Sequence, residues 1–260
     1  MTPEINREAS PDINPESLWF GRKKVSPQEK TEKVLGVFDS VADRYDIMND
    51  VMSAGLHRLW KNQFVRRVAP QAGGNYLDVA GGTGDIAFRL KKLGGEAAHV
   101  TIADINQSML AVGRARAIDR GYIGGFDWVE CDAAQLPFAD HSFDVYTISF
   151  GLRNVTRIDD ALREAWRVLK PGGRFFCLEF SHVDDDVLRD LYDFYSFRII
   201  PQMGKWIAGD EASYQYLVES IRAFPERGAL CQRLIDAGFG RAFATPLTLG
   251  VVAIHEAWKL

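Results

Sequence analysis

Residues 75–85 constrain the fold of this chain more than any other segment. They read NYLDVAGGTGD, a short apolar run followed by a glycine-rich loop, and a helical pattern begins directly after them. Glycines at such a turn let the backbone bend tightly and approach a ligand closely, where a Cβ atom would clash. Gly81 and Gly84 are present, but Ile86 stands where a complete G-x-G-x-x-G fingerprint would have its third glycine. The segment therefore predicts a strand, a ligand-binding turn and a helix, without deciding which ligand is bound.

Strand and helix patterns alternate along the rest of the chain. Strands are predicted at residues 75–79, 99–103, 126–131, 143–150 and 174–180, and helices at 86–93, 108–117 and 159–169. Such alternation implies parallel pairing through right-handed crossovers. A helix at 225–237 then precedes two strands, 241–248 and 250–258, around Gly250. The prediction is an α/β protein with a Rossmann-like, mostly parallel sheet, a C-terminal antiparallel hairpin and helices on both faces.

The remaining segments complete the predicted domain organisation. Residues 1–30 are polar and are predicted to form a flexible arm. Residues 31–260 are predicted to form a single domain. Within it, residues 31–70 predict a helical lid on the substrate side, divided at Gly55, and residues 186–224 predict an aromatic-rich helical insertion on the same side.

Charge and cysteine usage exclude several classes of function. The net charge of −4 argues against a nucleic-acid partner, which usually requires a basic face. The three cysteines, Cys131, Cys177 and Cys231, are far apart and odd in number, which argues against disulfides and against a zinc site. Neither a signal peptide nor an apolar run long enough to span a bilayer is recognisable. The expectation is a cytoplasmic protein without a metal, with peripheral contact at the inner face of the membrane left open.

Acidic residues at strand ends point to the ligand of the glycine loop. Asp104 ends the second strand, 20 residues after Gly84, where a carboxylate can accept hydrogen bonds from both ribose hydroxyls. Asp132 ends the third strand and suits an adenine amino group, with Ala133 beside the ring. Residues 75–88 contain Asp78 and Asp85 but no Lys or Arg, which fits cationic S-adenosylmethionine (SAM) better than a pyrophosphate. The cofactor-binding residues predicted on these grounds are Asp78, Gly81, Gly84, Asp104, Asp132 and Ala133.

Five motifs in order resemble the motif set of class I SAM-dependent methyltransferases. They are LDVAGGTGD, ADIN, CDAAQLPF, FDVYTISF and RVLKPGG. Residues 45–61 and 149–155 are further similar to the ubiquinone/menaquinone biosynthesis C-methyltransferases, and this similarity extends from about Phe38 to Leu260. The resemblance adds Thr83, Ile105 and Ser149 to the SAM-contacting positions. Many relatives carry Asn where this chain has Asp132, and either side chain can accept from an adenine amino group.

The resemblance also implies a reaction, methylation of a ring carbon of a polyprenylated benzoquinol or of demethylmenaquinol. Such a carbon is a poor nucleophile until a ring hydroxyl begins to lose its proton, so the site must orient the ring and handle that proton. Arg153 follows the fourth strand, at the edge where ligands bind in open α/β sheets. The predicted catalytic residues are Arg153, His57, Tyr45 and Asp46, and the predicted substrate-binding residues are Met48, Asn154, Tyr195 and Tyr214.

Structural roles for these residues remain open from the sequence. Arg153 could pair with Glu164 or Glu179, His57 could bridge the N-terminal helices, and Asp46 could cap a helix. Competing functions are a NAD(P)-dependent oxidoreductase, another small-molecule methyltransferase, and a SAM-binding scaffold of a quinone-synthesis complex. A homodimer and membrane docking, through the basic residues 22–24 or through residues 192–206, are also left open.

Overall fold

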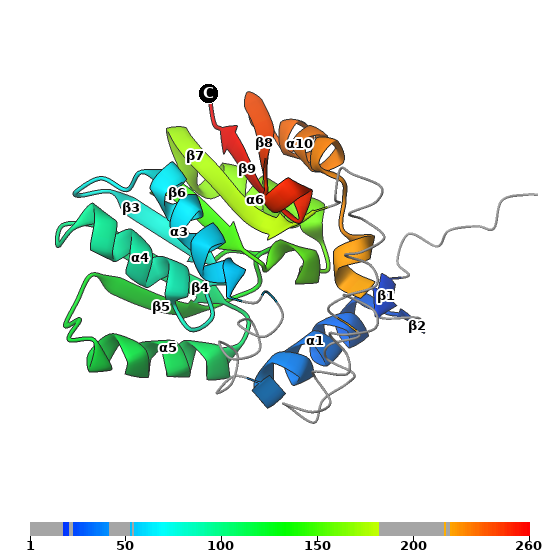
Figure 1. The fold of residues 1–260 in the computed structure, drawn as a ribbon, viewed down its shortest axis with the longest axis horizontal. Coiled ribbons are helices and arrows are strands. Elements are labelled where there is room, and N and C mark those ends of the chain that lie inside the picture. The colour runs from blue at the N-terminus through cyan, green and yellow to red at the C-terminus, as the bar shows by residue number, and fades with distance from the viewer. Residues whose placement is uncertain (1–17, 21–22, 42–52, 54, 182–215, 217–218) are drawn as a thin grey trace, which may run out of the picture.

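The computed structural model describes residues 18–20, 23–41, 53, 55–181, 216 and 219–260 (Figure 1). Seven of the described strands form one sheet, and their bounds are β3 Asn75–Val79, β4 His99–Asp104, β5 Phe126–Glu130, β6 Phe143–Ser149, β7 Leu169–Phe180, β8 Arg241–Leu247 and β9 Val252–Trp258. The order across the sheet is β5–β4–β3–β6–β7–β9–β8. Strand β9 runs antiparallel to both β7 and β8, and the other neighbours are parallel. The predicted sheet with its closing antiparallel hairpin is confirmed.

Helices cover both faces of the sheet, as predicted. Their bounds are α3 Leu56–Val68, α4 Asp85–Gly94, α5 Gln107–Asp119, α6 Ile158–Val168 and α10 Arg227–Asp236. Because successive strand residues point to opposite faces, Tyr76 packs in a buried cluster with residues of α3 and α4, whereas Leu77 packs in a second cluster with residues of α6 and α10. Phe176 and Phe175 on β7 divide between the same two clusters. The sheet is therefore buried on both sides, and ligands can reach it only at its edges.

The described part of the N-terminal segment contains regular secondary structure. Strand β1, Leu18–Phe20, pairs antiparallel with β2, Lys23–Val25, and helix α1 spans Pro27–Val41. A capping box explains the helix start: the Glu29 amide donates to Ser26 Oγ, and the Ser26 amide donates to Glu29 Oε2 at 2.8 Å. Pro27 stands at the first helical position, where its missing N–H costs nothing. The described residues between 18 and 30 thus form a short hairpin and the start of a helix, and the flexibility of the arm stays a prediction.

Two other boundaries can be compared with the prediction. Gly55 lies before α3 with φ of 77°, a left-handed conformation that suits glycine, so the second predicted N-terminal helix begins directly after this residue. Strand β7 begins at Leu169, directly after α6, rather than at Arg174. Phe143 pairs with Leu169 and Val145 with Arg174, so residues 170–173 form a bulge within the strand. Most of the predicted insertion, residues 186–224, lies outside the described residues.

No helix in the described part of the chain is both long enough and apolar enough to cross a bilayer.

Candidate cofactor and active site

A pocket lies at the edge of the sheet where β3, β4 and β6 end. Eight of the nine predicted cofactor-binding residues line it: Asp78, Gly81, Thr83, Asp104, Ile105, Asp132, Ala133 and Ser149. The ninth, Gly84, does not line it but precedes α4 with φ of 82°, and a Cβ there would lie 2.9 Å from Trp128. Thr31, Val34 and Leu35 of α1 also line the pocket, and Thr31 Oγ1 lies 3.2 Å from Thr156 Oγ1. The first helix therefore closes one side of the pocket.

The glycine loop is held against the end of β4. The Gly81 amide donates to the Ala103 carbonyl at 3.2 Å, and the Gly82 amide donates to Asp104 Oδ2 at 2.8 Å. A Cβ on Gly81 would lie 2.6 Å from Ile102 Cγ2 and 2.9 Å from Asp78 Oδ2. Any larger residue at position 81 would push the loop away from the strands, so the loop approaches the pocket closely only because this residue is glycine.

Asp104 accepts hydrogen bonds from two loops that line the pocket. Its Oδ2 accepts from Gly82 and its Oδ1 accepts from the Asn106 amide at 2.9 Å. Burial raises the pKa of Asp104 to about 6, although these backbone hydrogen bonds oppose the shift. A carboxylate oxygen has two lone pairs, so each oxygen can still accept from a ligand hydroxyl. Asp104 can thus bind a ribose diol while it holds the glycine loop.

Two buried polar atoms suit a cationic ligand in this pocket. Asp78 is 1% exposed; its Oδ1 accepts from Thr147 Oγ1 at 2.8 Å, whereas its Oδ2 has no hydrogen-bond partner among the described residues. Ser149 Oγ is buried and lacks a described partner in the same way. Burial raises the pKa of Asp78 to about 7, and the nearby Asp85 and Asp104 add to the effect. An unpaired buried acid is costly, and a ligand cation would relieve that cost.

Positive charge in the pocket is already neutralised. Among the described residues that line it, Lys61 is the only Lys or Arg, and its Nζ lies 2.9 Å from Asp85 Oδ2. Burial raises the pKa of Asp85, but Lys61 and Arg89 more than offset this and lower it to about 2. The pocket therefore offers an ionised acid and a buried acid without a free cation. Such a pocket fits the sulfonium and ammonium groups of SAM and does not fit a pyrophosphate.

The part of the pocket around Asp132 is more exposed. Asp132 Oδ1 accepts from the Ala134 amide at 2.8 Å, and Oδ2 lies 3.3 Å from Arg157 Nη2. The Asp132 side chain is 44% exposed, so solvent weakens its hydrogen bonds relative to those of Asp104. In the described part of the chain, no three His, Cys, Asp or Glu side chains are grouped so that they could hold a metal ion.

SAM affinity is expected to depend on pH through Asp78. In the free pocket, burial keeps Asp78 protonated below a pKa of about 7, whereas a bound cation favours the ionised form. SAM binding then releases a proton, and the dissociation constant is expected to rise by up to about tenfold for each pH unit below 7. Calorimetry between about pH 6 and 8, in buffers with different ionisation enthalpies, measures both effects.

The variant Asp78→Asn provides the control, because it keeps an oxygen that can accept from Thr147 but cannot ionise. Its SAM affinity is expected to be lower and nearly independent of pH. An unchanged pH slope in this variant would assign the titration to another group. In SAM-free protein the raised pKa of Asp78 makes a contribution to folding stability that falls with pH, whereas SAM affinity rises with pH. This contribution is fully present below 3.8, the ordinary pKa of an aspartate, and is lost as the pH rises through about 7.

The predicted catalytic Arg153 is a buried member of an ion pair. It lies in the short helical turn η2, Leu152–Asn154, and is 8% exposed. Its Nη1 donates to Glu179 Oε1 at 2.9 Å and to the Phe150 carbonyl, and its amide donates to Glu179 Oε2. Of the two partners considered from the sequence, Glu179 is the one found, whereas Glu164 pairs with Arg167. Arg153 therefore ties the turn after β6 to the end of β7.

The turn presents its neighbouring residues to two cavities. Asn154 lines the cofactor pocket, whereas Arg153 lines a second cavity of about 620 Å3. Val155 and Thr156 line both, so they form a shared wall. Asn154 can therefore contact a ligand in the cofactor pocket while Arg153 contacts a ligand in the adjacent cavity.

The other predicted substrate-side residues are only partly described. His57 is 6% exposed on the inner face of α3, its amide donates to Ser53 Oγ, and it is not among the residues that line the pocket. Its direct role in chemistry stays a prediction. Tyr45, Asp46, Met48, Tyr195 and Tyr214 lie outside the described residues.

Two residues of the site were not singled out from the sequence. Lys61 pairs with Asp85, and the Tyr216 hydroxyl donates to Asn154 Oδ1 at 3.1 Å. Burial raises the pKa of Tyr216 to about 12, so it remains a donor. Tyr216 lies two residues after the predicted Tyr214, which was the available signal. No pattern in the sequence marked Lys61 as the partner of Asp85.

Comparisons with known proteins show the family of this chain. The model of the ubiE/COQ5 methyltransferase family matches residues 22–259. The ubiquinone/menaquinone biosynthesis C-methyltransferase UbiE of Brucella canis is 57% identical over 243 residues, which cover 93% of this chain and 90% of that protein. UbiE of Roseobacter denitrificans is 53% identical over 249 residues, covering 96% of this chain and 99% of that protein.

Solved structures support the fold alone. A SAM-dependent methyltransferase from Thermotoga maritima superposes with a TM-score of 0.62 at 18% identity, over 86% of this chain and 99% of that one. A SAM-dependent methyltransferase from Aquifex aeolicus gives 0.56 at 17% identity, over 77% of this chain and 89% of that one. Because the family model and these relatives cover nearly the whole described domain and its pocket, the chain belongs to the ubiE/COQ5 methyltransferase family.

Proposed function

We propose that this protein transfers the methyl group of SAM to a ring carbon of a polyprenylated benzoquinol, of demethylmenaquinol, or of both. The observation that carries the proposal is the identity of 53–57% to UbiE C-methyltransferases over more than nine-tenths of the chain. The pocket supports it, because its described lining offers acids for a cationic ligand and no free cation for a phosphate.

The residues divide into a cofactor set and a substrate set. SAM supplies an electrophilic methyl group when bound, and Asp78, Asp104 and Ser149 hold its cationic and ribose parts. The further contacts in the cofactor set come from Gly81, Thr83, Ile105, Asp132 and Ala133, with Gly84 shaping the loop. The ring carbon gains the methyl group and loses a proton, so the net products are the methylated quinol, S-adenosylhomocysteine and a proton. The substrate set must therefore orient the ring and accept or relay that proton.

Arg153 acts on the ring oxygen in this proposal. Its Nη1 is engaged by Glu179 and Phe150, but its Nε has no hydrogen-bond partner among the described residues and can donate to a phenolate. Asn154 contacts the substrate, with its carboxamide oriented by Tyr216. Further substrate-side roles are assigned to His57, Tyr45 and Asp46 in proton handling, and to Met48, Tyr195 and Tyr214 in binding.

The proposed substrate also bears on location. A polyprenyl quinol resides in the bilayer, so the enzyme must collect it there. We assign the protein a peripheral position at the inner face of the membrane, either by direct contact with lipid or through a quinone-synthesis complex.

The experiment is a methyl-transfer assay with labelled SAM and two short-tailed acceptors, a demethylated benzoquinol and demethylmenaquinol, under reducing conditions. Label on a ring carbon of one or both, located by mass spectrometry, is the expected result. Asp104→Ala serves as a variant deficient in SAM binding, and heat-denatured protein serves as the blank. SAM binding without transfer to either acceptor would contradict the proposal and direct the search to another acceptor or to a scaffold role.

A further inference from the structure

Three leucines that are exposed to solvent lie close to the edge of the sheet that carries the pocket. Leu56 is 38% exposed, Leu59 is 62% exposed and Leu249 is 69% exposed. Leu56 and Leu59 are three residues apart on α3 and so share one side of the helix. Leu249 lies in the short turn η4, Thr248–Gly250, and this turn is tied to α3 because Trp60 Nε1 donates to Thr248 Oγ1 at 2.7 Å. We call these three residues the leucine rim.

The backbone at Leu249 is strained. Thr248 has φ of 48° and Leu249 has φ of 56°, so two consecutive residues with side chains are in the left-handed region. Such a conformation is unfavourable for residues that carry a Cβ atom. A leucine that is two-thirds exposed recovers little of this cost through burial in the fold. Strain of this kind, at a residue that the core does not use, is typical of a functional surface.

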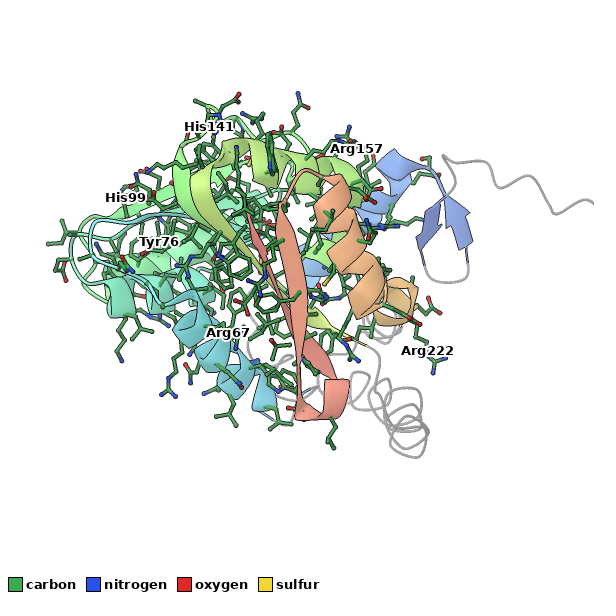
Figure 2. All side chains as sticks on the ribbon, turned by 90° about the horizontal axis from the view of Figure 1, so that it is seen from above. Arg67, Tyr76, His99, His141, Arg157 and Arg222 are labelled. Carbon is green, nitrogen blue, oxygen red and sulfur yellow. The ribbon has the colours of Figure 1, made fainter. Side chains whose placement is uncertain are left out.

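The connectivity places the leucine rim on the pocket side of the sheet. Helix α3 leads into the start of β3, so its first residues, Leu56 and Leu59, lie toward the opposite edge, where β3 ends at the glycine loop. Turn η4 precedes β9, and Val252 at the start of β9 pairs with Phe180 at the end of β7. Figure 2 shows α3, which carries Arg67, beside the turn that precedes β9. The leucine rim thus borders the edge where the ligand pocket opens.

Helix α3 also carries an excess of positive charge. Its sequence LHRLWKNQFVRRV contains Arg58, Lys61, Arg66 and Arg67 and no acidic residue, although the whole chain has a net charge of −4. Lys61 is buried against Asp85, but Arg58, in the first turn with Leu56 and Leu59, is exposed on the outside of the helix, whereas Arg66 lies in the last turn, away from the pocket edge. An apolar rim beside an arginine is complementary to a bilayer with anionic headgroups, in which leucines enter the acyl boundary and the arginine meets a phosphate.

We propose that the leucine rim, together with Arg58, is the surface by which this protein docks on an anionic phospholipid bilayer. The proposal rests on the proposed function, which requires a substrate dissolved in lipid. The opposite edge of the sheet, where the strands begin, provides a matched comparison, because Ile118 in α5 is 74% exposed and Ile123 in the loop after α5 is 103% exposed. Exposed apolar residues alone therefore do not distinguish the two edges, but the pocket and the strained turn do.

The test is flotation of the full-length protein with vesicles of phosphatidylethanolamine and phosphatidylglycerol. Leu59→Gln combined with Leu249→Gln is expected to weaken vesicle binding by roughly tenfold or more, because two apolar side chains are lost from the interface. Arg58→Gln is expected to weaken it by about fivefold, with a reduced dependence on salt. Ile118→Gln combined with Ile123→Gln is expected to float like the unchanged protein.

Circular dichroism and methyl transfer to a short-tailed, water-soluble quinol show that each variant is folded and active. The rim variants are expected to keep this activity and to lose transfer to a long-tailed quinol in vesicles. Flotation of the rim variants at the level of the unchanged protein would overturn the proposal, as would an equal loss in the Ile118 and Ile123 variant or a loss found only on changing Lys23 and Lys24. If the unchanged protein methylates no quinol, the proposed function fails, and the flotation series still decides the docking surface.

Discussion

Glu179→Ala is expected to lower the free energy of unfolding by about 3–5 kcal/mol, because it leaves the Arg153 guanidinium buried without its counter-ion. Glu179 is fully buried at the end of β7 and accepts hydrogen bonds from the Arg153 amide, from Arg153 Nη1 and from the Phe180 amide. All three are lost together. For a chain of this size the melting temperature should fall by roughly 10 °C, measured by calorimetry or thermal circular dichroism.

Two further variants test this explanation. Asp127→Ala removes an exposed partner of His99, and its effect is expected to stay within about 0.5 kcal/mol because solvent screens that pair. The double variant Arg153→Met, Glu179→Leu replaces the buried pair by apolar groups and should recover much of the lost stability. An effect of Glu179→Ala as small as that of Asp127→Ala would show that the pair does not hold the turn after β6.

Arg153→Lys separates the structural role of Arg153 from its proposed role in chemistry. Lysine keeps a positive charge beside Glu179 but cannot engage Glu179 and the Phe150 carbonyl while it also donates to a substrate oxygen. The expected result is a modest loss of stability and a fall in kcat of about 10²-fold or more at saturating SAM. An unchanged kcat would remove Arg153 from the catalytic residues and leave it as a residue that positions the turn.

Asp104→Ala is expected to weaken SAM binding by about 2–4 kcal/mol, or roughly 30- to 1000-fold in the dissociation constant. Two hydrogen bonds from ribose hydroxyls to a buried carboxylate would be lost. The Gly82 and Asn106 amides would also lose their acceptor, so the glycine loop would no longer be held in its binding conformation. Calorimetric titration with SAM and with S-adenosylhomocysteine measures the change.

Asp132→Ala is the matched control for this variant. Asp132 also ends a strand at the pocket, but its side chain is 44% exposed and its loss is expected to cost no more than about tenfold in affinity. Equal losses for Asp104→Ala and Asp132→Ala would contradict the assignment of Asp104 to the ribose. Retention of full SAM affinity in Asp104→Ala would remove it from the cofactor site.

The cofactor half of the site could be predicted because its determinants are local. A glycine that leaves room for the loop and an acid at the end of a strand are set by a few neighbouring residues, so Gly81, Asp104 and Ala133 could be recognised in the sequence and do line the pocket. The capping box at Ser26 and Glu29 is also a local feature of the sequence, although both residues lie within the segment that was predicted to be an arm. The substrate half of the site depends on contacts between distant segments, so the sequence left the partners of its residues open.

The partner of Arg153 illustrates that difference. Both Glu164 and Glu179 were plausible from the sequence, and the choice followed from the parallel pairing of β6 and β7, which sets Ser149 beside Leu178 and so brings the turn after β6 over Glu179. The contacts of Lys61 with Asp85 and of Tyr216 with Asn154 likewise join segments 24 and 62 residues apart.

The sequence by itself determined the order of strands and helices, the ligand-binding turn and the acids at the strand ends, because these follow from periodicity and backbone geometry over a few residues. Only the tertiary structure decided which acids are buried, which charges are paired and which leucines stay exposed. Burial and pairing depend on segments that are far apart in the chain, and they set the pKa of Asp78, the ion pair of Arg153 and the exposure of the leucine rim.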